Sequence, residues 1–186
     1  MSALKKYHQF IVAGVSTAGK STFSHELIKK YCVQHICIDP IVDAFQTVFP
    51  QLGITHEAPD LKSHLAVCQK FKPFVFKMLD ELDVEDFVLE GFRLPLESIY
   101  DRYPQLQYFV FGFPNATVEE RLEACRKHDV SNWTNFMPDD ELRNSMVFLI
   151  EESKRLQGIC EKLDVPFFDT SKEYWPNIKK ALDMTE

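Results

Sequence analysis

Gly14-Val15-Ser16-Thr17-Ala18-Gly19-Lys20-Ser21-Thr22 is the stretch of this sequence that determines its fold class. It fits the pattern G-x-x-x-x-G-K-[S/T], which carries meaning only between a strand and a helix. The apolar run at residues 10–13 predicts a buried strand before it, and apolar residues at helical spacing follow it, namely Phe23, Leu27, Ile28 and Tyr31. Such a turn directs successive backbone N–H groups and a helix N-terminus at one point, and therefore forms an anion site.

The side chains of this phosphate-binding loop (residues 14–22) suit a nucleoside triphosphate. Gly14 and Gly19 allow backbone angles and a close approach that a Cβ atom would forbid. Lys20 brings a mobile positive charge to the outer phosphates, and the hydroxyl of Ser21 can ligate Mg²⁺. A chance match in a Gly/Ser-rich turn is the alternative, but the flanking strand and helix favour the binding site. We therefore expect ATP and Mg²⁺ as cofactors.

Size and charge limit the class of protein. A chain of 186 residues, 45% of them hydrophobic, is expected to form one globular domain. The formal net charge of −7 and the absence of a Lys/Arg run argue against a nucleic-acid partner. No apolar stretch approaches about 18 residues and no apolar leader is visible, so we expect no membrane partner and a cytoplasmic location. The five scattered cysteines predict free thiols in a reducing compartment.

Apolar runs and helical patterns alternate along the whole chain. Such alternation predicts an α/β fold, a parallel sheet with helices on both faces. The expected strands are 8–13, 35–39, 86–90, 107–112 and 165–169, and the expected helices are 20–33, 61–83, 115–128, 139–163 and 174–183. Pro73 is expected to kink or split the second of these helices. The polar segments 50–59 and 127–137 could form a cover over a ligand at the carboxyl ends of the strands.

The end of the third expected strand carries a family resemblance. In Glu90-Gly91-Phe92-Arg93-Leu94-Pro95, an acidic residue ends a buried strand and a glycine follows, as expected of a carboxylate on the Mg²⁺ side of a phosphate site. The segment is similar to D-G-F-P-R of adenylate kinases. The chain thus resembles the nucleoside-monophosphate-kinase-like branch of P-loop kinases, which includes adenylate-kinase-, shikimate-kinase- and zeta-toxin-like small-molecule kinases. Here the carboxylate is one carbon longer, and Arg93 comes one position earlier.

The resemblance implies an architecture and a metal site. It implies a single P-loop kinase domain over residues 1–186, with three α/β/α layers and a five-stranded parallel sheet in the order 2-3-1-4-5. A helical acceptor-binding insert would span about 40–83, and a short lid would span about 126–138. Ser21 and Glu90, the latter through water, would hold Mg²⁺.

Two arginines after the fourth expected strand extend the resemblance. Segment 113–122 is similar to the approach to the family's lid, with Arg121 in an E-R-L-like turn; Arg126 follows five residues later instead of four. By analogy, Arg121 contacts the base or a phosphate, and Arg126 stabilises the transferring phosphoryl group, whose charge an arginine fork suits. The alternative is that both are surface residues paired with neighbouring glutamates.

Segment 165–171 resembles the last strand and base-side loop of several kinases in this branch. The resemblance implies that the backbone around Asp169 and Thr170 lies beside the adenine. Asp169-Thr170-Ser171 is also an ordinary cap for the following helix, and the two interpretations are compatible.

The acceptor side is marked by Asp39, at the end of the second expected strand. Kinases of this branch that phosphorylate an alcohol use an Asp here to orient or deprotonate the hydroxyl, whereas nucleotide acceptors need arginines for their phosphate. The sequence contains no Arg between residues 31 and 92, which favours a hydroxylated acceptor. A helix cap is the alternative role for Asp39.

These features predict an ATP- and Mg²⁺-dependent phosphotransferase acting on a small, hydroxylated metabolite. Lys20, Asp39 and Arg126 are the expected catalytic residues. Two alternatives stay open, a nucleoside-monophosphate kinase and a nucleotide-binding regulatory or toxin-like protein with little turnover. The sequence is compatible with a monomer or a homodimer.

Overall fold

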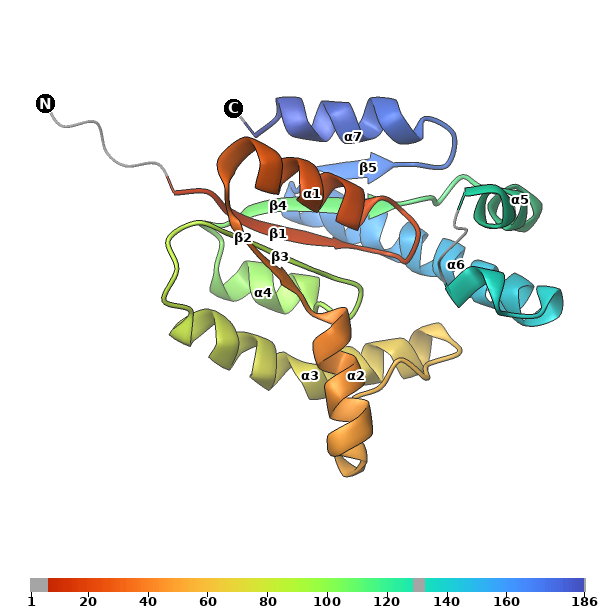
Figure 1. Ribbon diagram of the computed structural model, residues 1–186, viewed down its shortest axis with the longest axis horizontal. Helices are drawn as coiled ribbons and strands as arrows, with labels where there is room; N and C mark the ends of the chain where they lie inside the picture. Colours follow the sequence, from red (N-terminus) through yellow and green to blue (C-terminus); the bar gives the residue numbers. More distant parts are fainter. Residues whose placement is uncertain (1–6, 129–132, 186) are drawn as a thin grey trace, which may run out of the picture.

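The computed structural model describes residues 7–128 and 133–185, and its described residues form a five-stranded parallel sheet. The strand order is β2-β3-β1-β4-β5, which confirms the predicted order. Figure 1 shows the strands side by side in the centre of the molecule. Their bounds are β1 (Gln9–Gly14), β2 (Gln34–Cys37), β3 (Phe87–Gly91), β4 (Gln107–Gly112) and β5 (Phe167–Asp169).

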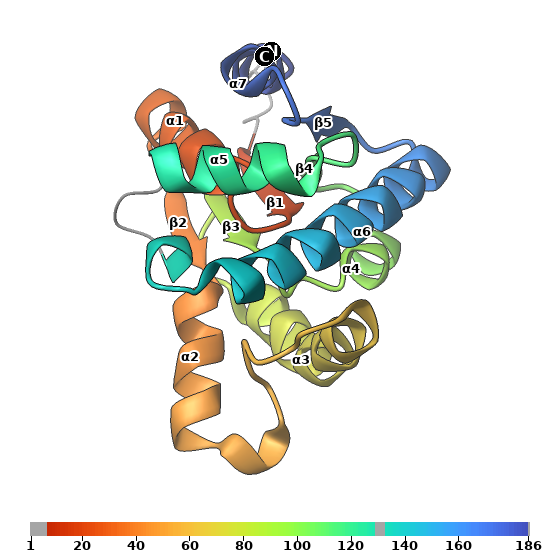
Figure 2. The same ribbon diagram turned by 90° about the vertical axis from the view of Figure 1, so that its right-hand side faces the viewer.

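Helices cover both faces of the sheet and complete three layers. Figure 1 shows α1 and α7 on one face and α3 and α4 on the other; Figure 2 shows α6 running along the second face. The helices are α1 (Lys20–Tyr31), α2 (Asp39–Val48), α3 (Leu61–Glu81), α4 (Leu96–Arg102), α5 (Val118–His128), α6 (Asp139–Leu163) and α7 (Tyr174–Asp183), with short 3₁₀ turns η1 (Pro50–Leu52) and η2 (Trp133–Asn135). No helix within the described ranges has both the length and the apolar character to cross a bilayer.

The three central strands are buried because each face of the sheet packs against helices. Phe10, Ile11 and Val12 of β1 are fully buried, and every residue of β3 is buried as well. Continuous apolar runs of this kind are typical of strands in a parallel sheet. The edge strands β2 and β5 are only partly buried. All five cysteines are free thiols, as predicted.

The sequence patterns miss α2 and α4 and misplace the end of β2. The strand expected over 35–39 ends at Cys37, and Asp39 is the first residue of α2, where an acidic residue followed by Pro40 suits a helix N-terminus. Residues 39–48 are rich in β-branched side chains, which have low helix propensity. Packing of the apolar face of α2 therefore stabilises this helix. The helix α4 was missed because its 7 residues are too few to give a clear helical pattern in the sequence.

Pro73 does not split α3, and the alternative, that it kinks the helix, stays a prediction. The helix runs without interruption from Leu61 to Glu81, although proline removes one of its backbone hydrogen bonds. Phe71 and Val75 on either side of Pro73 are fully buried. Their burial holds both halves of the helix against the core and offsets the missing bond.

Gly14 marks the point where the chain leaves β1 for the phosphate-binding loop. Its φ is +139°, and a Cβ atom at this position would lie 2.1 Å from the carbonyl oxygen of Phe111 in β4. The end of β1 and the backbone of β4 thus approach each other more closely than any side chain allows.

We expect Gly14→Ala to lower the free energy of unfolding by about 3 kcal/mol or more, because the new methyl group meets backbone that cannot move aside. Gly158→Ala is the matched control. Gly158 lies inside α6 with nothing within 4 Å of the added Cβ, so alanine should raise the free energy of unfolding by about 0.5–1 kcal/mol. Urea denaturation followed by circular dichroism measures both. Equal stability of Gly14→Ala and the unaltered protein would contradict the close approach.

Candidate active site

The phosphate-binding loop presents the N-terminus of α1 at the carboxyl edge of the sheet. The helix begins at Lys20, and Gly19 before it has a φ of +103° and no side chain to cap the helix. The first N–H groups of α1 therefore have no capping side chain and can bind an anion. Thr17 also has a positive φ, 61°, which is uncommon for a residue with a side chain and shows that the loop is tightly constrained.

A first pocket of about 670 Å³ opens beside this helix end. Three parts of the chain line it: the phosphate-binding loop, α5, and the connection from β5 into α7. The lining residues are Thr17, Gly19, Lys20, Ser21, Thr22, Arg121, Ala124, His128, Thr170, Ser171, Lys172, Tyr174 and Trp175. A concave site with a helix N-terminus and positively charged groups suits a phosphorylated ligand.

Arg121 connects α5 to the loop and is not a solvated surface residue. Its side chain is buried, with 7% exposed, and its guanidinium donates to the carbonyl oxygen and the hydroxyl of Thr17 at 3.2 and 2.8 Å. The guanidinium carbon lies 4.1 Å from the centre of the Phe113 ring. Arg121 therefore supports the strained residue of the loop and also faces the first pocket; its contact with base or phosphate stays a prediction.

Lys20 and Ser21, at the end of the loop, lie close to Glu90 of β3. The Lys20 ammonium donates to the carbonyl oxygen of Val15 at 2.9 Å, and the Ser21 hydroxyl donates to Oε1 of Glu90. Nε2 of His35 lies 3.0 Å from Oε2 of Glu90. The structure thus brings together the two residues expected to serve the metal.

The Glu90 carboxyl group is ionised although only 1% of the residue is exposed. Burial acts to raise the pKa of Glu90, but the hydrogen bond from Ser21 and the charge of Lys20 outweigh it, so the pKa lies below its usual value. A hydroxyl and a charged carboxylate are hard oxygen ligands of the kind Mg²⁺ prefers, so this pair fits the expected ion.

Thr170 and Asp169 hold the connection from β5 to α7 against the loop. The Thr170 hydroxyl donates to the carbonyl oxygen of Ala18 at 3.1 Å, and Thr170 lines the first pocket. Asp169 lies behind it and accepts from the Asn115 amide at 2.7 Å and from the Ser171 backbone at 2.8 Å. The N-cap of α7 is Glu173, so Asp169 joins two loops and does not cap that helix.

The aromatic side of the first pocket was not expected from the sequence. Tyr174 places its hydroxyl 2.7 Å from that of Thr22, and Trp175 beside it is 66% exposed. Lys172 adds a positive charge to the same wall. The adjacent Tyr-Trp pair after the expected base-side loop is a signal that could have identified this wall.

A second pocket of about 810 Å³ lies on the other side of the phosphate-binding loop. Its lining residues come from the loop, from α2 and the segment after η1, from the end of β3, and from η2 and α6. They are Ser16, Asp39, Asp43, His56, Glu57, Ala58, Pro59, Phe92, Arg93, Trp133, Met137, Ser145, Phe148 and Leu149. Ser16 lines the second pocket and Thr17 the first, so the two pockets meet at adjacent residues of the loop.

Asp39 faces the second pocket with an unsatisfied oxygen. Its Oδ1 is buried and has no hydrogen-bond partner, and the N-cap of α2 is Ile38 without a capping side-chain bond. The side chain of Asp39 is therefore not a helix cap. Asp43, one turn later, pairs with His56 at 3.3 Å instead. A buried carboxylate oxygen without a partner is costly unless a ligand group supplies one.

Arg126 holds the segment predicted to form a lid, of which residues 129–132 lie outside the described residues. It donates to the carbonyl oxygens of Thr134 and Met137 at 2.6 and 2.8 Å, and it pairs with Asp139 at 2.6 Å. The acidic partner of Arg126 is thus Asp139 and not a neighbouring glutamate, which was the alternative considered above. Arg126 is not among the lining residues of either pocket, and its contact with a phosphoryl group stays a prediction.

Comparisons with family models and with curated proteins found no match. Among solved structures, the shikimate kinase from Bacteroides thetaiotaomicron is similar, with a TM-score of 0.61 and 14% sequence identity over 96% of this chain and 98% of that chain. At this identity the likeness shows the fold alone. The five-stranded sheet, its strand order and its flanking helices therefore match a P-loop kinase fold, and the kinase branch that the sequence resembles stays a prediction.

Proposed function

We propose that the protein transfers the γ-phosphoryl group of ATP to a hydroxyl group of a small molecule bound in the second pocket. The observation that carries the proposal is the position of the phosphate-binding loop between the two pockets, with Thr17 facing one and Ser16 the other. A nucleotide whose outer phosphates are held by the loop would present its γ-phosphate to the second pocket. Such an arrangement provides the proximity that phosphoryl transfer needs.

The groups around the loop have the charges that this reaction needs. Lys20 and the N–H groups at the start of α1 would hold the β- and γ-phosphates, and Ser21 with Glu90, through water, would hold Mg²⁺. The ion would neutralise charge on the phosphates. Arg121 keeps the loop in its constrained shape through Thr17. We assign to Arg126, by its family resemblance, a share in stabilising the transferring group.

Asp39 is the residue that would act on the acceptor. Its unsatisfied Oδ1 can accept a hydrogen bond from a hydroxyl group in the second pocket. As the acceptor oxygen forms its bond to the γ-phosphorus, the bond from that phosphorus to the β–γ bridging oxygen breaks and ADP leaves. The hydroxyl proton passes to Asp39.

The domain layout proposed with this function is one P-loop kinase domain with two accessory segments. Residues 40–83 supply one wall of the second pocket through His56 and the residues after it, which fits an acceptor-binding insert. Trp133 and Met137, within the segment 126–138, supply the opposite wall, which fits a lid.

A nucleoside-monophosphate kinase stays the second candidate, because the structure weakens the argument from the lack of arginines on the acceptor side. Residues 31–92 lack arginine, but Arg93 just beyond them lines the second pocket. Incubation with labelled ATP and separate panels of nucleotides and small alcohols discriminates the two candidates. Tight ATP binding without hydrolysis or transfer in either panel would favour a regulatory protein and contradict the enzyme.

Lys20→Ala should abolish detectable ATP binding and reduce phosphoryl transfer by about 10²-fold or more, because the outer phosphates lose their mobile positive charge. Calorimetry measures ATP binding, release of labelled product measures transfer, and circular dichroism verifies the fold. Lys29→Ala is the control, since Lys29 is an exposed residue of α1 that pairs with Glu26. Unchanged ATP affinity in Lys20→Ala would contradict the proposed site.

Asp39→Asn should reduce transfer by about 10²-fold or more while the dissociation constant of ATP changes by no more than a few-fold, because the amide keeps its shape but cannot accept the proton. The two quantities are measured by product formation and calorimetry. Asp101→Asn, an exposed residue of α4, is the matched control. Unchanged turnover in Asp39→Asn would show that Asp39 takes no part in the reaction.

A further inference from the structure

Both carboxylate oxygens of Glu90 have a partner within the protein. The hydroxyl of Ser21 donates to Oε1, and Nε2 of His35 lies 3.0 Å from Oε2. An ionised carboxylate can only accept hydrogen bonds, so Nε2 of His35 must carry a hydrogen and donate it. Hydrogen bonds to a charged acceptor are stronger than those between neutral groups. The function proposed above uses Ser21 and Glu90 but gives His35 no role.

The pairing of β2 with β3 brings His35 to this carboxylate. Cys37 of β2 is the register partner of Glu90, so their side chains lie on the same face of the sheet. Side chains alternate along a strand, so His35, two residues before Cys37, lies on that face as well. Ser21 and His25 are one turn apart on one side of α1, and the ring of His25 lies 5.8 Å from that of His35 between centres. The helix α1 thus covers the pair of Glu90 and His35.

His35 is the more exposed member of this pair. Its strand, β2, forms one edge of the sheet, and 27% of its side chain is exposed, against 2% of the Glu90 side chain. Without the imidazole, Oε2 of Glu90 would lack its protein donor and would depend on water at this edge. A glutamate side chain has several rotatable bonds, so the loss of one anchor would leave the position of its carboxylate less defined.

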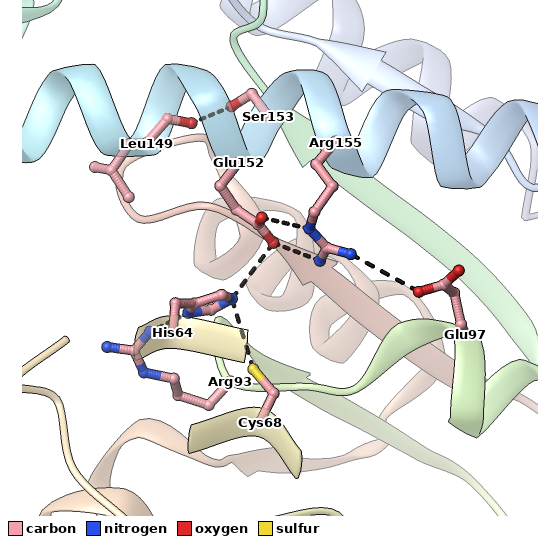
Figure 3. A network of polar contacts seen from close by, with 8 residues as sticks. All are labelled: His64, Cys68, Arg93, Glu97, Leu149, Glu152, Ser153 and Arg155. Carbon is pink, nitrogen blue, oxygen red and sulfur yellow. Dashed lines mark hydrogen bonds and ion pairs between the residues drawn. The ribbon is translucent and has the colours of Figure 1, made fainter. Parts of the chain in front are cut away.

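Glu152 in α6, the second buried glutamate among the described residues, has a different set of partners (Figure 3). Arg155 donates two hydrogen bonds to its carboxylate, at 2.6 and 2.7 Å, and Nε2 of His64 lies 3.3 Å from its Oε1. Nδ1 of His64 accepts in turn from Arg93. A permanently charged arginine therefore neutralises Glu152 directly.

Glu90 has no such cation bound to it. Within the described ranges its partner at ion-pair distance is His35, and neither a lysine nor an arginine lies that close. Lys20, whose charge is nearby, donates to the carbonyl oxygen of Val15. Buried charges are normally paired or coordinate a metal, so the charge of Glu90 is available to a cation. Ser21 is an expected ligand of that ion, whereas His35 holds the other carboxylate oxygen, so its bond can persist when the ion binds.

We propose that His35 is a positioning residue that holds the Glu90 carboxylate in the orientation that binds Mg²⁺, and that it acts only through Glu90. Hydrogen bonds of this kind orient the carboxylates of metal sites. The proposal rests on the ATP and Mg²⁺ site of the function proposed above, but ion binding can be measured without turnover. A Mg²⁺ requirement that depends on His35 in a protein without phosphoryl transfer would refute the kinase and leave this inference intact. Transfer whose Mg²⁺ requirement does not depend on His35 would do the reverse.

The first test measures how Mg²⁺ strengthens nucleotide binding. The probe is an ATP analogue with an imido group at the β–γ bridge, titrated by calorimetry at a series of Mg²⁺ concentrations and in EDTA. His35→Asn ends near the position of Nδ1 and does not reach Oε2, whereas His35→Gln places an amide nitrogen near Nε2 and keeps the bond. His8→Asn is the matched control, because His8 pairs with Asp86 at the amino ends of β1 and β3, away from the site.

In His35→Asn, we expect the Mg²⁺ concentration for half of the gain in affinity to rise about 5-fold or more, because the carboxylate loses its orientation. It should rise by no more than about 2-fold in His35→Gln and in His8→Asn. In EDTA, every variant should bind the analogue as tightly as the unaltered protein, because His35 is not among the described lining residues of either pocket. Damage to the phosphate-binding loop would instead weaken binding with and without Mg²⁺.

An unchanged Mg²⁺ requirement in His35→Asn would overturn the proposal, as would equal losses in His35→Asn and His35→Gln. A loss of the same size in EDTA would show that His35 only supports the fold. Binding by the unaltered protein that does not respond to Mg²⁺ would also overturn the proposal. Circular dichroism verifies the folding of each variant. Should His35→Asn not fold, His35→Thr takes its place, since threonine suits a strand and is too short to reach Oε2.

The second test examines whether His35 acts through Glu90. Glu90→Ala removes the carboxylate and should raise the Mg²⁺ requirement by about 10-fold or more. Adding His35→Asn to Glu90→Ala should change the requirement by no more than about 2-fold further, because the imidazole then has no carboxylate to orient. A residue that merely supports the fold would add its full effect to that of Glu90→Ala, and such additivity would overturn the proposal.

Discussion

The close approach between Gly14 and the carbonyl oxygen of Phe111 is the constraint on which the site depends. The backbone N–H of Val15 donates to the same carbonyl at 3.2 Å, so the phosphate-binding loop leaves the sheet at one defined point between β1 and β4. Beyond that point Ser16 lines the second pocket, and Thr17 and residues 19–22 line the first, so the loop separates the two pockets. A side chain at position 14 would displace the loop from the N-terminus of α1 and from both pockets.

Charged groups are concentrated inside the protein near this loop. Lys20, Glu90, Arg93, Arg121 and Glu152 are all buried, and each makes at least one hydrogen bond. Burial of charge costs free energy, so such groups are retained where a binding site needs them. The two carboxylates are satisfied within the protein, Glu90 by Ser21 and His35 and Glu152 by Arg155 and His64. Arg93 keeps a buried Nε without a hydrogen-bond partner.

The core of the fold could be predicted from the sequence, whereas parts of the site could not. The buried strands were recognisable as short apolar runs, and the strand order came from the family resemblance that Lys20 and Glu90 carry. The helix α2 was missed because its residues favour strands and only packing makes them helical. Arg126 looked like a group for the phosphate, but its hydrogen bonds hold the segment that follows α5.

The phosphate-binding loop, the parallel sheet and the carboxylate near the end of β3 could be predicted from the sequence, because each depends on residues that are neighbours along the chain. The surroundings of the second pocket could not, because they depend on tertiary packing. His64, Arg93 and Glu152 come from α3, from the segment after β3 and from α6, and nothing in their sequence spacing relates them. Their meeting depends on how these elements pack on one face of the sheet (Figure 1). The same packing buries Arg93, and burial makes its charge costly unless it is paired.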